Sequence, residues 1–405
     1  MTDTKQSQMP IQNHLGIVEV PVHYMRGGTS TGVVISEHWV PKDESLRAEL
    51  LLHLMGAPLS GHQKGNRQIS GLGRGVATSN KVFLASVEET PTGRQLVSTL
   101  AQLASEHGEI DWSVNCGNMS SALPLWAIDT GLFQAPLMGD IEISIRNTNT
   151  QVVTITRMLR DTNGRLVTSE IPGVDGAYPR VDLFLQAPVG SKTGTLLPTG
   201  TVVDTIAGHE VSCVDVAVPM VIADAKSFGK TGHEPVAELE ADAAFIAALR
   251  HVWIEAGLKM GLHRRDGELM SRADLEKSET IPKVCIVGAA QQGGSIAVRY
   301  FTPQTGHASM AVSGGCCLAA ACLIPGTVAH KLAQGIIQPT ESFSDVEVGI
   351  ENPAGRLDAT VVAASYGGGD IAIQSAAYRR STQILMRGYV PLYRASATLI
   401  GALVG

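Results

Sequence analysis

The chain has 405 residues, of which 44% are hydrophobic and 17% are charged, a composition typical of a globular protein with a large core. This length exceeds that of one ordinary domain, so we expect two. The net charge of −7 argues against nucleic acid as a partner. With no apolar run of eighteen residues, no transmembrane helix and no membrane partner are expected.

The N-terminal residues are polar and lack the apolar segment of a signal peptide. The six cysteines are too few and too scattered for a disulfide framework in a chain of this length. We therefore expect reduced thiols and a cytoplasmic location.

Strand-like runs rich in Val, Ile and Thr dominate the first half of the chain, with Gly-rich turns between them. The first half predicts strands at 16–25, 31–40, 80–87, 141–159 and 179–188. The second half predicts strands at 208–224, 282–290, 295–301, 346–352, 359–366, 370–378 and 382–390. The longest helical pattern covers residues 235–262 and is rich in Ala, Leu and Glu.

Each half also contains an apolar helix that starts beside glycine, at 119–131 and at 316–326. Both segments are apolar on nearly every side, which is typical of a helix that is buried all round. A parallel sheet with alternating helices would need more helical segments than the sequence offers. We therefore predict an α+β fold in which each half wraps strands around a central helix.

Cys116 lies at the turn between a predicted strand and the first of these helices, in the stretch "VNCGN". Unpaired N–H groups and the positive dipole end at a helix start stabilise a thiolate there. The alternative is a small turn cysteine without a role, and the residues alone leave both open.

Other candidate motifs have weaker support. The glycines at 71–75 and the "GKT" at 229–231 lack the strand and helix context of a nucleotide loop. The stretch "GTSTG" around Ser30 matches the serine-hydrolase pattern, yet another strand follows it, so we interpret it as a hairpin turn. Cys316, Cys317 and Cys322 lack metal-ligand spacing, so they are expected to be core thiols and no metal site is predicted.

Several segments together resemble one family of isomerases. The stretches "MRGGTSTG", "GLGRGVATSNK", "DWSVNCGNMSSA", "LLPTG", "PKVCIVGAA", "HASMAVSGG", "IPGTVA" and "NPAGRLD" follow one another across residues 25–358. They are similar to the family that includes 2-methylaconitate cis-trans isomerase, 4-oxalomesaconate tautomerase and the Δ-isomerases of methylitaconate and aconitate. The stretch around residues 282–312 is more similar to the oxalomesaconate branch.

The resemblance implies a diaminopimelate-epimerase-like fold of two similar domains with the active site between them. Each domain is a curled, mainly antiparallel sheet around a central helix. The first would comprise residues 1–190 plus C-terminal strands at about 380–405, and the second residues 191–379. The family's lysine and cysteine pair falls on Lys81 and Cys116, although the residues around Lys81 alone would indicate only a surface lysine.

The activity implied is a cofactor-independent 1,3-allylic proton shift or cis-trans isomerisation of an unsaturated di- or tricarboxylate. Removing a proton beside a carboxylate leaves a dienolate, which needs an acid, a base and preorganised N–H groups. Glycines at 27, 28, 314 and 315 are expected to let the substrate approach the backbone. The expected substrate-binding residues are Arg26, Gly28, Thr29, Ser30, Gly117, Asn118, Met119, Thr199, Gly200, Arg299, His307, Ser313, Gly314 and Gly315.

Two positions depart from the family pattern, Thr31 where a lysine is usual and Ser70 where an acidic residue is often found. Ser313 stands where related epimerases carry a second cysteine, so inversion by two thiols is not expected. The polycarboxylate and the direction of the acid and base roles remain open. The alternatives are a serine hydrolase that uses Ser30 and a non-catalytic carboxylate-binding protein. If the chain self-associates, a homodimer is expected.

Overall fold

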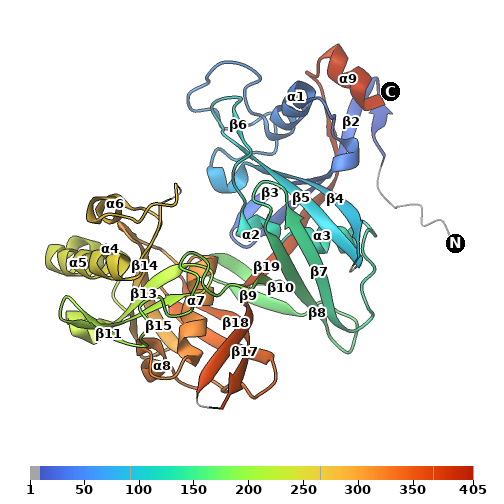
Figure 1. The fold of residues 1–405 in the computed structure, drawn as a ribbon. Coiled ribbons are helices and arrows are strands. Elements are labelled where there is room, and N and C mark those ends of the chain that lie inside the picture. Colours follow the sequence, from blue (N-terminus) through green and yellow to red (C-terminus); the bar gives the residue numbers. More distant parts are fainter. Residues whose placement is uncertain (1–9, 92, 265, 368, 405) are drawn as a thin grey trace. The chain divides into compact units, whose positions relative to one another are not determined.

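The computed structural model describes residues 10–404 apart from 92, 265 and 368. It divides into two compact units (Figure 1). Unit 1 comprises Met1–Glu170, Val174–Leu183 and Arg380–Gly405, and unit 2 comprises Ile171–Gly173 and Phe184–Arg379. Apart from the short segment Ile171–Gly173, the chain passes from unit 1 to unit 2 inside the strand β10 (Val174–Gln186) and returns inside the long strand β19 (Asp370–Pro391).

Unit 1 is mostly strand. Its remaining strands are β1 (Gln12–His14), β2 (Ile17–Gly27), β3 (Ser30–Ser36), β4 (Lys81–Thr90), β5 (Gly93–Leu103), β6 (Ile110–Asp111), β7 (Gly139–Asn147), β8 (Val153–Arg160) and β9 (Thr168–Ile171). Its helices are α1 (Glu44–Met55), α2 (Gly117–Ser120), α3 (Leu123–Asp129) and α9 (Ala397–Val404), with 3₁₀ turns η1 (Glu37–Trp39) and η2 (Ala77–Ser79).

Unit 2 contains more helix. Its strands are β11 (Asp204–Ile206), β12 (His209–Asp215), β13 (Pro219–Asp224), β14 (Lys283–Gly288), β15 (Ile296–Thr302), β16 (Thr305–Gly306), β17 (Ser344–Asn352) and β18 (Gly355–Tyr366). Its helices are η3 (Ala225–Phe228), α4 (Val236–Ala241), α5 (Ala243–Lys259), α6 (Arg272–Lys277), α7 (Val312–Leu323) and α8 (Val328–Leu332).

The two units share one order of strand pairing. In unit 1 the pairs β2–β3, β4–β5 and β7–β8 are antiparallel, and the pairs β3–β4 and β5–β7 are parallel. In unit 2 the pairs β12–β13, β14–β15 and β17–β18 are antiparallel, and β13–β14 and β15–β17 are parallel. The same order of strand pairing therefore occurs twice, in agreement with the predicted α+β fold of two similar halves.

A helix lies inside the strands of each unit. In unit 1, Met119, Leu123 and Trp126 of α2 and α3 share one buried cluster with residues of the surrounding strands, among them Phe83. In unit 2, α7 is buried from Gly314 to Leu323 and packs on β12, β13, β17 and β18. The apolar character of both helices on every side is explained by this surrounding sheet, and the prediction of two central helices is confirmed.

Further helices cover the outer face of each sheet. In unit 1 the leucines of α1 pack with β2, β3 and β4, and Leu399 of α9 joins the same cluster. In unit 2 the outer layer is α5 with α6. Asp43 starts α1 by accepting the N–H groups of Ser45 and Leu46, and Gly56 ends it in the left-handed region with a φ of 70°.

The sequence predictions were wrong in several local details. The first central helix is split into α2 and α3, with Pro124 in the first turn of α3. The long helix predicted at 235–262 divides at Asp242, whose side chain caps α5. Strand does not continue to the C-terminus, because β19 ends at Pro391 and α9 follows. None of the helices within residues 10–404 that the structure describes combines the length and apolar character needed to cross a bilayer.

Candidate functional site

Lys81 is the first residue of β4 and is 8% exposed. Its ammonium donates to the side-chain oxygen of Gln102, which is also its register partner on β5. The amide nitrogen of Gln102 donates in turn to the carbonyl oxygens of Asn80 (3.0 Å) and Leu103 (3.1 Å). Gln102 is thus fixed to the backbone and holds the lysine side chain in one place.

Strand alternation defines the face toward which Lys81 points. Residues two apart on a strand share a face, so Lys81 is on the same face as Phe83, which packs against α2 and α3. Val82 points the other way, into the cluster beneath α1. Lys81 therefore projects from the face of the sheet that carries the helix following Cys116.

Cys116 caps that helix. Its backbone is extended (φ −128°, ψ 99°), and the N–H of Met119 donates to its sulfur at 3.5 Å. Its own N–H donates to the side chain of Asn115 at 2.7 Å, and its carbonyl accepts the N–H of Ser120 at 2.8 Å. The thiol is partly exposed. It also lies at the start of the helix, where the backbone N–H groups carry partial positive charge.

The hairpin turn after β2 is packed against the start of this helix. A Cβ on Gly27 would lie 2.5 Å from the carbonyl oxygen of Asn118, and one on Gly28 would lie 2.5 Å from the Asn118 side-chain oxygen. The Asn118 amide donates to the hydroxyl of Thr29 at 3.2 Å. The interpretation of "GTSTG" as a hairpin turn is confirmed, since β3 begins at Ser30. Gly27 and Gly28 were expected to let the substrate approach the backbone. This reason needs correction, because protein atoms occupy the space where their side chains would lie.

Lys81 and the Cys116 helix lie at the same end of the strands. Gly27 is the last residue of β2 and contacts the first turn of α2. Gly32 lies two residues into β3, and a Cβ on it would be 2.5 Å from the carbonyl oxygen of Lys81. Because β2 and β3 pair as a hairpin, one end and one face of the sheet carry both residues of the expected pair.

Two arginines tie β19 to this region. Arg380, which is 6% exposed, donates to the side-chain oxygen of Asn118 at 2.7 Å. Arg26 donates to the carbonyl oxygens of Gly28 (2.8 Å) and Ser381 (3.1 Å), and its guanidinium lies 4.7 Å from the ring centre of Tyr178. These contacts favour a positioning role for Arg26 at the turn.

The sequence alone did not indicate a role for Gln102 or Arg380. The signal for Arg380 is the pair of arginines in the otherwise apolar strand "AAYRRSTQIL", since a buried charge needs a partner. For Gln102, only the register with Lys81 reveals its role.

The remaining predicted residues lie in unit 2, and its loops hold several of them. The hydroxyl of Thr199 donates to Asp204 at 2.6 Å, and Gly200 follows in the left-handed region. The guanidinium of Arg299 donates to the carbonyl oxygens of His233 and Val298, and burial lowers its pKa.

His307 is held beside the second central helix. Its backbone N–H donates to the carbonyl oxygen of Tyr300 at 2.8 Å, and its ring nitrogen accepts the N–H of Ser309 at 2.9 Å. Its ring meets that of Tyr300 edge-on, with the ring centres 5.8 Å apart.

Ser313, Gly314 and Gly315 lie in the first turn of α7, inside the helix and not before it. A Cβ on Gly314 would lie 2.6 Å from the ring of Tyr300, and one on Gly315 would lie 2.9 Å from the ring of Tyr378. The N–H of Gly315 already donates to Ala311. The expected reason for the two glycines is therefore corrected, because aromatic rings occupy the space where their side chains would lie.

Five of the six cysteines are fully buried, and Cys116 is the exception. Burial raises the pKa of the Cys317 and Cys322 thiols and that of Cys213 to about 12. These thiols stay protonated and act as core residues, as predicted for the two on α7. Among the residues that the structure describes, no group of three or more His, Cys, Asp or Glu side chains could hold a metal ion.

Comparison with known proteins agrees with this architecture. Residues 17–393 match the family model described as PrpF protein. The protein YbhH of Escherichia coli (strain K12) is 32% identical over 92% of this chain and 99% of its own length. The 4-oxalomesaconate tautomerase of Pseudomonas putida (strain KT2440) is 29% identical over 85% of this chain and 89% of its own length. The crystal structure of a methylitaconate Δ-isomerase, 25% identical, superposes with a TM-score of 0.75 and covers 96% of this chain and 97% of its own.

The chain belongs to the PrpF family. It is an enzyme of the isomerase class, in agreement with the resemblance seen in its sequence.

Proposed function

We propose that this isomerase moves a proton between two carbons of an allylic system in an unsaturated di- or tricarboxylate, with Lys81 and Cys116 as the acid–base pair. The observation that carries the proposal is their convergence on one face and one end of the unit 1 sheet. Two groups of different chemistry at such a position can remove a proton from one carbon and deliver one two carbons away.

The chemistry balances without a further reactant. One member of the pair takes a proton from a carbon next to a carboxylate, and the electron pair left behind spreads over the allylic system onto carboxylate oxygens. The other member donates a proton at the far end, so substrate and product are isomers and no cofactor is consumed. The exposed thiol at a helix start and a lysine fixed by Gln102 suit these two roles.

Substrate binding is proposed for residues of each unit. Thr29, Ser30 and the backbone of Gly117, Asn118 and Met119 surround the helix start, with Gly28 and Arg26 shaping the turn. In unit 2 the proposed set is Thr199, Gly200, Arg299, His307, Ser313, Gly314 and Gly315. Arg299 and the two glycines have contacts that favour positioning roles within this set.

The particular substrate is inferred from the comparisons. A 4-oxalomesaconate tautomerase and a methylitaconate Δ-isomerase are both similar over most of their length. The names of both proteins indicate isomerisation of an unsaturated carboxylate. We therefore expect a substrate of this class, handled in the cytoplasm by a protein whose cysteines are free.

A serine hydrolase is the weaker alternative. The hydrolase pattern requires its serine on a sharp strand-to-helix turn, whereas Ser30 starts a hairpin strand and is 2% exposed. No described feature favours this alternative or that of a non-catalytic binding protein.

The test is a substrate screen in D₂O. cis-Aconitate, trans-aconitate, 2-methylaconitate, methylitaconate and 4-oxalomesaconate would be followed by ultraviolet absorbance and proton NMR. We expect one of them to isomerise and to gain deuterium at its allylic carbons. Turnover that survives Cys116→Ser but is lost in Ser30→Ala would contradict the proposal and favour the hydrolase. If none of the compounds exchanges a proton, the proposed substrate class is wrong.

A further inference from the structure

Lys283 occupies in unit 2 the position that Lys81 occupies in unit 1. Each lysine is the first residue of its strand, β14 and β4. Each of these strands is parallel to one neighbour and antiparallel to the other. The strand repeat described above therefore places a lysine at the same site twice.

The register makes the correspondence exact to the residue. In unit 1 the parallel pair is Val33 with Val82, and in unit 2 it is Val221 with Val284. The residues after the two lysines, Val82 and Val284, both point to the outer face, where α1 or α5 covers them. Lys283 must then point to the inner face, as Lys81 does.

The inner face of unit 2 carries the helix α7. Cys285, two residues after Lys283 and on the same face, is buried, and the thiols of Cys317 and Cys322 on α7 contribute to the rise of its pKa after desolvation. Lys283 thus projects toward the side of the sheet where α7 packs, just as Lys81 projects toward α2 and α3.

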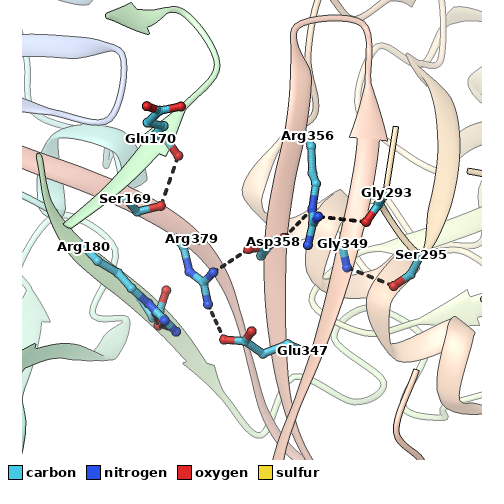
Figure 2. Close-up of polar contacts among 11 residues, drawn as sticks. Ser169, Glu170, Arg180, Gly293, Ser295, Glu347, Gly349, Arg356, Asp358 and Arg379 are labelled. Atoms are coloured by element: carbon cyan, nitrogen blue, oxygen red, sulfur yellow. Dashed lines mark hydrogen bonds and ion pairs between the residues drawn. The ribbon is translucent and has the colours of Figure 1, made fainter. Parts of the chain in front are cut away.

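Lys283 differs from Lys81 in its contacts. Within the described part of the chain its partly buried ammonium makes no hydrogen bond or ion pair, and desolvation by burial lowers its pKa. Two arginines of unit 2 have partners: Arg379 pairs with Glu347 and Asp358, and Arg356 donates to Asp358 and to the carbonyl oxygen of Gly293 (Figure 2). A half-buried cation without a counter-ion is unfavourable, and an anionic ligand would relieve that cost.

A second polar group lies near the start of α7. Tyr300 is 1% exposed, and among the described residues its hydroxyl has no hydrogen-bond partner. It pairs with Cys285 across β14 and β15, so it shares the inner face with Lys283. Its hydroxyl would lie 3.0 Å from a Cβ on Gly314, in the first turn of α7. In this turn the N–H groups of Val312, Ser313 and Gly314 have no acceptor within the helix.

We propose that Lys283 is an anion-binding residue of unit 2 that takes one carboxylate group of a small polycarboxylate. Ser313 and the first turn of α7 supply hydrogen bonds to the same group. The inference rests on the proposed function for the substrate class, and it adds a residue that the proposed function does not use. The strand repeat then supplies Lys81 for proton transfer and Lys283 for recognition of a carboxylate charge.

The test uses tricarballylate, a saturated tricarboxylate that cannot undergo an allylic shift. Its affinity for the full chain would be measured by isothermal titration calorimetry. Lys283→Met keeps the length of the side chain and removes the charge, so we expect affinity to fall about tenfold or more, as for loss of a hydrogen bond to a charged group. Lys283→Arg keeps the charge and should retain most of the affinity. Lys331→Met, at an exposed lysine of α8 that pairs with Glu210, is the matched control and should bind as the parent does.

A second readout observes binding in the parent protein and needs only the charge-conserving variant Lys283→Arg, for assignment. Lysines of the parent protein would be reductively methylated with ¹³C-formaldehyde, and the Lys283 signal assigned by its absence from the spectrum of Lys283→Arg. Tricarballylate should shift this signal. Binding by the parent with unchanged affinity in Lys283→Met, or an unshifted signal, would overturn the inference and leave the proposed function standing. Failure of the parent to bind tricarballylate would count against the polycarboxylate function itself.

Discussion

The two units share one plan of strand pairing but differ at the start of the helix inside the sheet. In unit 1 the cap is Cys116, a partly exposed thiol, and the helix is broken after one turn. In unit 2 the cap is Ala311, the helix is continuous, and its cysteines are buried further along. The repeated strand pattern therefore carries a lysine at both strand starts and a cysteine cap at only one helix start.

The difference shows how position changes the surroundings of the same side chain. Burial raises the pKa of the Cys317 thiol, which stays protonated. Cys116 is partly exposed and caps a helix start, where the backbone N–H of Met119 donates to its sulfur. Position along the helix, and not residue type, separates the two.

The largest effect is expected from replacing either residue of the proposed acid–base pair in unit 1. Cys116→Ala or Lys81→Met should lower kcat by about 10²-fold or more, the scale of a positioned acid or base. Steady-state kinetics on the substrate found by the screen would measure this. The matched variant in unit 2 is Cys317→Ala, at a buried core thiol, which should lower stability and leave kcat nearly unchanged. Near-normal kcat in either unit 1 variant would contradict the assignment.

The next largest effect is expected at Gly27. Alanine there would place its Cβ 2.5 Å from the backbone oxygen of Asn118 and 2.9 Å from the Cα of Met119. Backbone cannot move aside as a flexible side chain can, so Gly27→Ala should destabilise by about 1–3 kcal/mol, the usual cost of overpacking. Denaturant unfolding would measure the change.

Gly388→Ala is the control for Gly27→Ala, because a Cβ on Gly388 would meet no atom within 4 Å. It should change the free energy of unfolding by less than about 1 kcal/mol. Equal effects of the two variants would show that the turn and the helix start do not pack as described.

A smaller effect is expected at the helix start of unit 2. Ser313 lies in the first turn of α7, where a thiol would be needed for two-cysteine chemistry. Because its proposed role is a hydrogen bond to a carboxylate, worth about 1 kcal/mol, Ser313→Ala should raise KM a few-fold and change kcat less. A loss of kcat as complete as in Cys116→Ala would contradict the binding role of Ser313 and indicate that both helix starts take part in proton transfer.

The smallest expected effect concerns the far end of the unit 1 helix. His23 on β2 is bonded to Asp129, the last residue of α3, at 3.0 Å, and its pKa is lowered, chiefly by burial. The unfolded chain, with an ordinary histidine pKa near 6.5, then binds more protons than the folded one. Stability should therefore rise with pH through the region below about 6.5, and the contribution of His23 is lost as the pH falls through that window.

His23→Gln should reduce this pH dependence, measured as the free energy of unfolding between pH 5 and 7. His53, whose pKa is also lowered by burial, would account for part of the dependence that remains. An unchanged slope in His23→Gln would indicate that the histidine titrates alike in both states.

The sequence by itself determined the local elements that patterns encode. All-round apolar character identified the two central helices, and Val, Ile and Thr runs identified most of the strands. Lys81 at a strand start and Cys116 at a helix start were also readable, because caps and strand ends are local features. Helices α1 and α9 were missed: Leu50–Met55 of α1 are buried in succession and show no polar face, and α9 is only eight residues long.

Only the tertiary structure decided what surrounds those residues. Arg380 reaches Asn118 across 262 positions of sequence, and no local pattern records such a pairing. The crowding beside Gly27 and Gly314 comes from segments distant in the chain. The correspondence of Lys81 with Lys283 is a property of strand register. Register is fixed by packing between strands, so it becomes visible only once the sheet has formed.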